Sequence, residues 1–212
     1  MDKAISYLHI TSAILCLLYF IGFSKQGKAY KIFTIYITVV LAIDFIASHL
    51  WDWFGIYNIF TSHFYDLLQF VLLSYFYGNL LNTKKQLYTV YLLLIILPFF
   101  LLVRYVFNPE MFFEYSLLEM YLTTMPIIIY ATMHLYNHLG KKIELYYINI
   151  GLLFYLFGST VIFLLYELLG MFKVRSTLFD NLSIINIVLQ YIKFGFFFYQ
   201  WKLIYFKTNE NT

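Results

Sequence analysis

Seven apolar stretches, each about 20 residues long, constrain the fold of this chain more than any other feature. In the fourth of them, the segment 92–103 contains no polar side chain. Stretches of this length match the hydrocarbon thickness of a bilayer when they are helical. Only 12% of the residues are charged, against roughly 25% in soluble domains, which is too few to cover a water-exposed surface. We therefore expect an all-α integral membrane protein.

The apolar stretches predict a transmembrane bundle of seven spans with short loops. Strands are not expected, because the stretches are too long and do not alternate between apolar and polar residues. The spans use nearly the whole chain, so residues 1–212 are expected to form a single membrane domain. The expected spans are residues 4–23, 32–50, 57–77, 87–107, 115–135, 147–169 and 179–201.

Basic residues between the spans predict the orientation. One set of loops holds nine lysines, and the opposite set holds only Lys3, Lys173 and Arg175. The richer side is expected in the cytosol, which leaves the N-terminus outside and the C-terminus inside a plasma or inner membrane. Loop charge of this kind favours contact with anionic lipid and not with nucleic acid. The nine are Lys25, Lys28, Lys31, Lys84, Lys85, Lys141, Lys142, Lys202 and Lys207.

Polar side chains in the last span repeat on one helical face. Asn186, Gln190 and Lys193 are spaced by four and three residues, which places them on the same side of a helix. A lysine near the middle of a span is costly in hydrocarbon and is expected to point into the protein. This face therefore predicts an interior polar site.

The third span carries a similar polar face. Ser62, Asp66 and Gln69 are spaced by four and three residues, and His63 precedes Asp66 by three. Polar residues on other spans fall in the same extracytoplasmic half, which predicts a cavity open to the outside and closed towards the cytosol by Lys193. The alternative is a polar network that only joins helices. The predicted ligand-binding set is Asp66, Lys193, Gln190, Gln69, Asn186, Asp44, His63, His49, Ser62 and Glu119.

No cofactor or metal site is predicted. His134 and His138 have the i, i+4 spacing of a metal-binding pair, but they are expected at the cytosolic interface beside lysines. Cys16 is the only cysteine, which excludes an internal disulfide and a cysteine-based metal cluster.

One enzyme class resembles part of this pattern. Ser48, His63 and Asp66 are similar to the serine, histidine and aspartate in early spans of embedded hydrolases of the ceramidase and progestin-receptor-like superfamily. That resemblance implies seven spans and a zinc-dependent hydrolase. The family's histidine pair in the last span has no counterpart here, so the zinc site would be incomplete.

The polar faces favour a small transporter of a polar small molecule or ion. The first alternative is a membrane sensor or accessory subunit that signals to a separate partner protein, because the tail after Trp201 is too short for an output domain. The second alternative is the membrane-embedded hydrolase. A transporter or a sensor would not be an enzyme.

Overall fold

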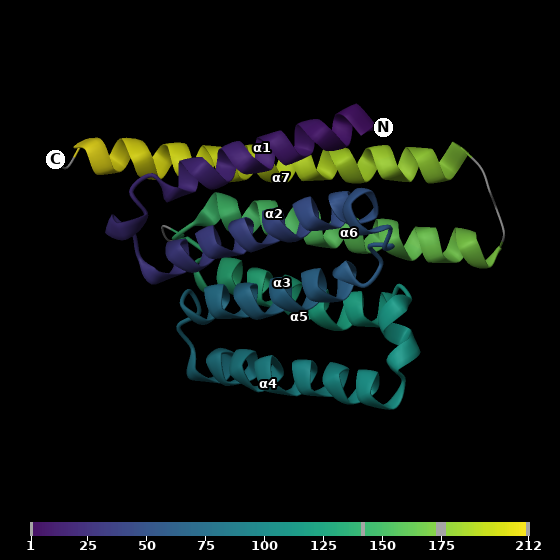
Figure 1. The fold of residues 1–212 in the computed structure, drawn as a ribbon. Helices are drawn as coiled ribbons and strands as arrows, with labels where there is room; N and C mark the ends of the chain where they lie inside the picture. The colour runs from purple at the N-terminus through teal and green to yellow at the C-terminus, as the bar shows by residue number, and fades with distance from the viewer. Residues whose placement is uncertain (1, 141–142, 173–176, 211–212) are drawn as a thin grey trace. The chain divides into compact units, whose positions relative to one another are not determined.

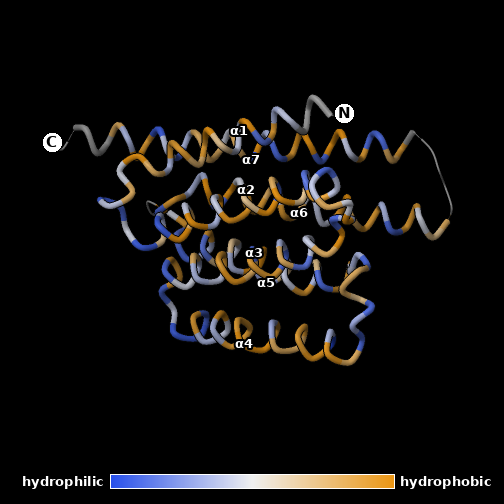
Figure 2. Tube along the Cα trace, viewed as in Figure 1, coloured by the Kyte–Doolittle hydropathy of each residue, from blue (hydrophilic) through white to orange (hydrophobic). Residues whose placement is uncertain are grey.

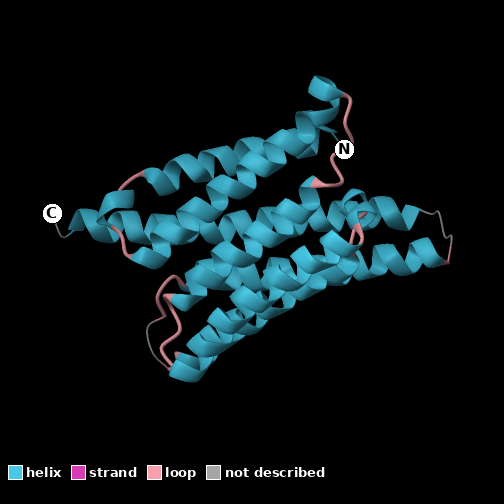
Figure 3. Ribbon diagram, turned by 60° about the horizontal axis from the view of Figure 1, so that its bottom comes forward, coloured by secondary structure: helices cyan, strands magenta, loops and turns pink. Residues whose placement is uncertain are grey.

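The computed structural model describes residues 2–140, 143–172 and 177–210, and every regular element in these ranges is helical (Figures 1 and 3). The all-helical prediction is confirmed. Lys141, Lys142, Lys173 and Arg175, which entered the charge comparison, lie outside the described residues. The elements are α1 (Asp2–Phe20), η1 (Phe23–Lys25), α2 (Lys28–Phe54), α3 (Thr61–Gly78), α4 (Lys84–Phe107), η2 (Pro109–Phe113), α5 (Leu117–Asn137), α6 (Tyr146–Met171) and α7 (Thr177–Glu210).

The helices follow the predicted spans, with differences at their ends. The helix starts differ most in α2, which begins at Lys28 and not at residue 32, and in α3, which begins at Thr61 and not at residue 57. Gly55, in the left-handed conformation, ends α2, which suits glycine because it has no Cβ to clash. Asn58 then accepts hydrogen bonds from the backbone N–H and the side-chain hydroxyl of Thr61. This turn occupies the residues that the sequence assigned to the span.

Four helices in the described residues are long and apolar enough to cross a membrane, namely α2, α4, α6 and residues 178–206 of α7. A shorter apolar helix covers Ser6–Phe20. Figure 2 shows α4 as hydrophobic along most of its length and hydrophilic at its first turn. α3 and α5 are not among the four, and they are the helices that hold the buried residues His63, Asp66 and Glu119.

The chain divides into two compact units, Met1–Gly22 with Gly140–Thr212, and Phe23–Leu139. In the first unit, α7 packs against both α1 and α6 (Figure 1). The hydroxyl of Tyr19 on α1 donates a 2.8 Å hydrogen bond to the carbonyl oxygen of Phe197 on α7. Gly151 of α6 lies so close to α7 that an added Cβ would be 3.0 Å from the Cβ of Phe196.

In the second unit, α3 packs against α2, α4 and α5. Aromatic side chains fill this contact, and Phe33, Phe70 and Phe76 are completely buried. Helices in a bilayer associate through such packing and through interhelical hydrogen bonds, because lipid tails are as apolar as the side chains. The antiparallel order of the helices places the start of α3, the end of α4 and the start of α5 at one end of this unit.

Candidate functional site

Three side chains from three helices of the second unit form a buried hydrogen-bonded cluster. His63 of α3 places Nδ1 2.7 Å from Oε2 of Glu119 on α5. The hydroxyl of Tyr105 on α4 lies 2.8 Å from the same Nδ1 and donates a hydrogen bond to the same Oε2. His63 is 4% and Glu119 1% exposed, so the cluster is in the interior of the unit.

The beginning of α5 fixes the position of Glu119. Ser116 is the N-cap of α5, and its hydroxyl oxygen accepts a hydrogen bond from the backbone N–H of Glu119, as expected for an N-cap serine. Nη1 of Arg104, near the end of α4, donates a 2.7 Å hydrogen bond to the same hydroxyl oxygen. The side chain of Ser116 therefore links the end of α4 to the start of α5, next to the cluster.

Asp66 adds a second carboxylate to the cluster. It is buried on α3, three residues after His63, and interacts electrostatically with Glu119. The charges of Asp66, Glu119 and Arg104 all act on Tyr105.

One nitrogen of the cluster lacks a hydrogen-bond partner. Nε2 of His63 is buried and makes no hydrogen bond in the described residues. Such an atom costs about 1–3 kcal/mol relative to a satisfied one, and it calls for a bound water, ion or other explanation. We therefore treat Nε2 as the open position of the cluster.

Phe112 of η2 packs over the cluster. Its ring stacks on the imidazole of His63 with centroids 5.4 Å apart, and it meets the ring of Tyr105 edge to face at 5.6 Å. Phe60 and Phe64 contact the ring of Phe112, with centroids 6.1 and 5.8 Å from its own. Aromatic side chains thus form one wall of the cluster.

Buried polar side chains continue along the contact between α3 and α5 towards the other end of the unit. Gln69 accepts a 3.1 Å hydrogen bond from the hydroxyl of Tyr36 on α2. Further along, the hydroxyls of Ser74 and Tyr130 are buried without hydrogen-bond partners in the described residues. The buried polar residues of this face are His63, Asp66, Gln69, Ser74 and Tyr77 on α3, and Glu119, Thr123, Thr124, Tyr130 and His134 on α5.

The first unit holds a polar group around Lys193. This lysine is buried on α7, and its Nζ lies 3.7 Å from the centre of the Tyr155 ring on α6 and 5.1 Å from that of Phe194. This is cation–π geometry. Asn186 and Gln190 are half-buried on the same helix, and Oδ1 of Asn186 makes no hydrogen bond in the described residues.

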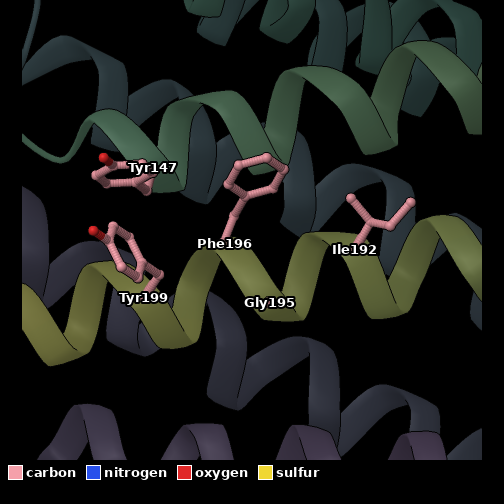
Figure 4. A pocket seen from close by; sticks show the side chains of 5 residues that line it. All are labelled: Tyr147, Ile192, Gly195, Phe196 and Tyr199. Atoms are coloured by element: carbon pink, nitrogen blue, oxygen red, sulfur yellow. The ribbon is translucent and has the colours of Figure 1, made fainter.

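A shallow, open hollow of about 270 Å³ lies beside α6 and α7 in the first unit (Figure 4). Tyr147 of α6 lines it, with Ile192, Gly195, Phe196 and Tyr199 of α7. The rings of Tyr147 and Tyr199 meet edge to face with centroids 4.6 Å apart. The lining is apolar and includes none of the polar residues predicted for the site.

Within the second unit, the structure brings together part of the predicted set. His63, Asp66 and Glu119 join the buried cluster, and Gln69 follows one turn further along α3. His49 instead stacks on Trp53 at 5.2 Å. Ser62 and Asp44, the other predicted residues of the second unit, are half-buried. The hydroxyl of Ser62 donates a hydrogen bond to the carbonyl oxygen of Ile59.

Sequence reasoning missed Tyr105 in the cluster and Phe112, which packs over it. Tyr105 was passed over because tyrosines near span ends are common interfacial anchors, and Phe112 because it lies in a loop. The distance of Tyr105 from the start of its span is the only sequence signal that could have placed it at the level of Glu119.

In the described ranges, no hydrogen bond joins Ser48, His63 and Asp66, the residues of the hydrolase resemblance. The hydroxyl of Ser48 donates to the carbonyl oxygen of Phe45 and lies 3.0 Å from Nδ1 of His49. Nδ1 of His63 is engaged by Glu119 and Tyr105. Among the described residues, no three histidine, cysteine or acidic side chains are placed to hold a metal ion.

Comparison with protein families, curated proteins and solved structures found no match to this chain.

Proposed function

We propose that this protein is a seven-span membrane transporter for a small polar solute or ion, and that the cluster of His63, Asp66, Tyr105 and Glu119 is its extracytoplasmic binding site. The observation that carries the proposal is the buried polar face that follows α3 and α5 along the second unit. Ionisable residues inside a membrane are costly, and they commonly mark substrate or ion pathways.

The proposed orientation has the N-terminus outside and the C-terminus in the cytosol. In the second unit, Lys28, Lys31, Lys84 and Lys85 begin α2 and α4, at the end opposite the cluster. Lysine-rich loops favour the cytosolic side, which places the cluster near the outer surface. A reporter fused after Lys207 is expected to be active only in the cytosol, and an extracytoplasmic signal would refute this orientation.

The extent of the polar face along α3 and α5 favours transport over a purely structural network. Interhelical hydrogen bonds can join helices without any ligand, and the bond from Tyr36 to Gln69 does so. A network with only that role has no use for unpartnered polar atoms, yet His63, Ser74 and Tyr130 each bury one. Such atoms suit a pathway that a solute or water occupies transiently.

Two-sided accessibility of position 69 tests the proposal. Cys16 is replaced by alanine, and a single cysteine is introduced as Gln69→Cys. A membrane-impermeant thiol reagent is then applied to right-side-out and to inside-out vesicles. Position 69 lies on the polar face, one turn beyond Asp66, so labelling from both sides is expected for alternating access. Tyr75→Cys is the matched control on the same helix, because this side chain is 46% exposed and outside the polar face.

The other outcomes identify the competing functions. Labelling of position 69 from outside alone would contradict transport and favour a sensor that signals to a partner protein. The absence of labelling from either side, or equal labelling at position 75, would mean that the polar face serves only to join helices.

A further inference from the structure

The hollow beside α6 and α7 exists because α7 has a glycine on that face. Gly195 lies three residues after Ile192 and four before Tyr199, so the three residues share one side of the helix. A Cβ added to Gly195 would meet no packing neighbour within 4 Å. Ile192 and Tyr199 are 41% and 44% exposed. The hollow is therefore open to the medium around these two helices.

That medium is expected to be hydrocarbon. α6 and residues 178–206 of α7 are long and apolar enough to cross a membrane. The hollow, at about 270 Å³, is smaller than the roughly 300–1,000 Å³ of pockets that enclose a whole small molecule. Its walls are the apolar side chain of Ile192 and the rings of Phe196, Tyr147 and Tyr199. An open apolar hollow of this size suits part of a flexible hydrocarbon chain.

The two ends of the hollow differ in polarity. Figure 4 shows the hydroxyl groups of Tyr147 and Tyr199 at the end away from Ile192. Lys202 follows Tyr199 by three residues on the same face of α7, about 10 Å along the helix from Gly195, and it is exposed. Its Nζ lies 5.9 Å from the centre of the Phe206 ring, one turn further on. Two hydroxyls and then an ammonium group therefore follow the apolar hollow.

Positive charge predominates at this polar end. Oε1 of Gln200 accepts a hydrogen bond from the backbone N–H of Tyr147, which places the first turn of α6, the positive end of its dipole, beside this part of α7. The sequence flanking the start of α6 and the end of α7 contains four lysines against two glutamates. They are Lys141, Lys142, Lys202 and Lys207, and Glu144 and Glu210.

The polar end determines which lipid the hollow selects. Lipid tails and apolar side chains are equally at home in hydrocarbon, so the hollow alone would accept the chain of any lipid. Lysines next to a membrane surface attract anionic headgroups. Tyrosine hydroxyls at the level of the headgroups can donate hydrogen bonds to phosphate oxygens.

We propose that this hollow binds one acyl chain of an anionic phospholipid, whose headgroup contacts Lys202 and the hydroxyls of Tyr147 and Tyr199. The chain lies over Gly195, between Ile192 and Phe196. This inference goes beyond the proposed function, because its ligand is a lipid of the surrounding membrane and its residues belong to the first unit.

Photo-crosslinking of the full-length protein in phosphatidylcholine nanodiscs tests the inference. Two probes are compared at equal mole fraction, phosphatidylglycerol and phosphatidylcholine, each with a diazirine in one acyl chain, and the labelled peptides are identified by mass spectrometry. Labelling of Tyr147 or of residues 192–199 is expected to be about fivefold stronger with the phosphatidylglycerol probe, because one lysine at a membrane surface favours anionic lipid by about that factor. Equal labelling by both probes would overturn the inference, since any surrounding lipid would then fill the hollow.

Gly195→Leu fills the hollow and leaves the charges in place. The variant is expected to fold, because the space over Gly195 is empty and leucine forms helices better than glycine. Labelling at the hollow should then be lost. Gly170→Leu is the matched control, because Gly170 also has no neighbour within 4 Å and does not line the hollow. Equal labelling of the two variants would exclude this site.

Lys202→Gln keeps the hollow and removes the charge. Labelling by the phosphatidylglycerol probe is expected to fall about fivefold, to the level of the phosphatidylcholine probe. An unchanged preference for phosphatidylglycerol would reject the role of Lys202. Wild-type protein that is labelled only outside Tyr147 and residues 192–199 would show that another surface covers the hollow, and would overturn the inference.

Discussion

Tyr105→Phe is the sharpest test of the cluster as a structural unit. The substitution removes one hydroxyl and keeps the ring that packs on His63 and Phe112. The lost bond is to a carboxylate, and such bonds contribute about 1.5–3 kcal/mol in soluble proteins. Interhelical hydrogen bonds in a membrane protein average about 0.6 and reach about 1.7 kcal/mol. We therefore expect the free energy of unfolding to fall by about 1–2 kcal/mol.

The assay is reversible unfolding in mixed micelles with increasing sodium dodecyl sulfate, followed by tryptophan fluorescence. Tyr88→Phe on the same helix is the matched control, because Tyr88 is 67% exposed, and no change beyond about 0.5 kcal/mol is expected there. A double-mutant cycle with Glu119→Gln should give a coupling energy of about 1 kcal/mol. A coupling indistinguishable from zero, or equal effects of the two tyrosine variants, would refute the hydrogen-bonded cluster.

Three further predictions use the same unfolding assay. Gly151→Ala is expected to lower the free energy of unfolding by about 1–3 kcal/mol, because the new Cβ would lie 3.0 Å from that of Phe196. Gly170→Ala is the control and should leave the stability unchanged, because no neighbour lies within 4 Å. Equal effects of the two variants would contradict the close packing of α6 on α7. Ser116→Ala removes the N-cap of α5 and is expected to lower the free energy of unfolding by about 1 kcal/mol. Wild-type stability in Ser116→Ala together with a loss of stability in Ser116→Thr would be inconsistent with a cap. Lys193→Met should leave the fold intact, since replacing a buried charge by an apolar side chain of similar volume is often neutral or stabilising; a loss of folding would show that the lysine is structurally required.

The sequence predicted the features that depend on one helix alone. Apolar length predicts the helices, and spacings of three and four residues on the third span correctly predict that Asp66 and Gln69 share a buried face. Glu119 of the fifth span was included in the predicted ligand-binding set because of its position along that span. These features are readable because a helix has a fixed period.

Features that depend on how helices rotate against one another were not readable. Tyr105 reaches His63 only because of the rotation of α4, and no periodicity along that apolar span indicates it. Phe112 is positioned by the 3-10 helix after α4, whose conformation has no hydrophobic pattern. The burial of Lys193 was expected, but its contact with Tyr155 depends on the register of α6 against α7.

Thiol labelling of Gln69→Cys in right-side-out and in inside-out vesicles tests the central claim most directly. The account predicts labelling of position 69, on the buried face of α3, from both sides of the membrane. Labelling from one side alone, or from neither side, would contradict the claim that the buried polar face of α3 and α5 carries a solute across the membrane.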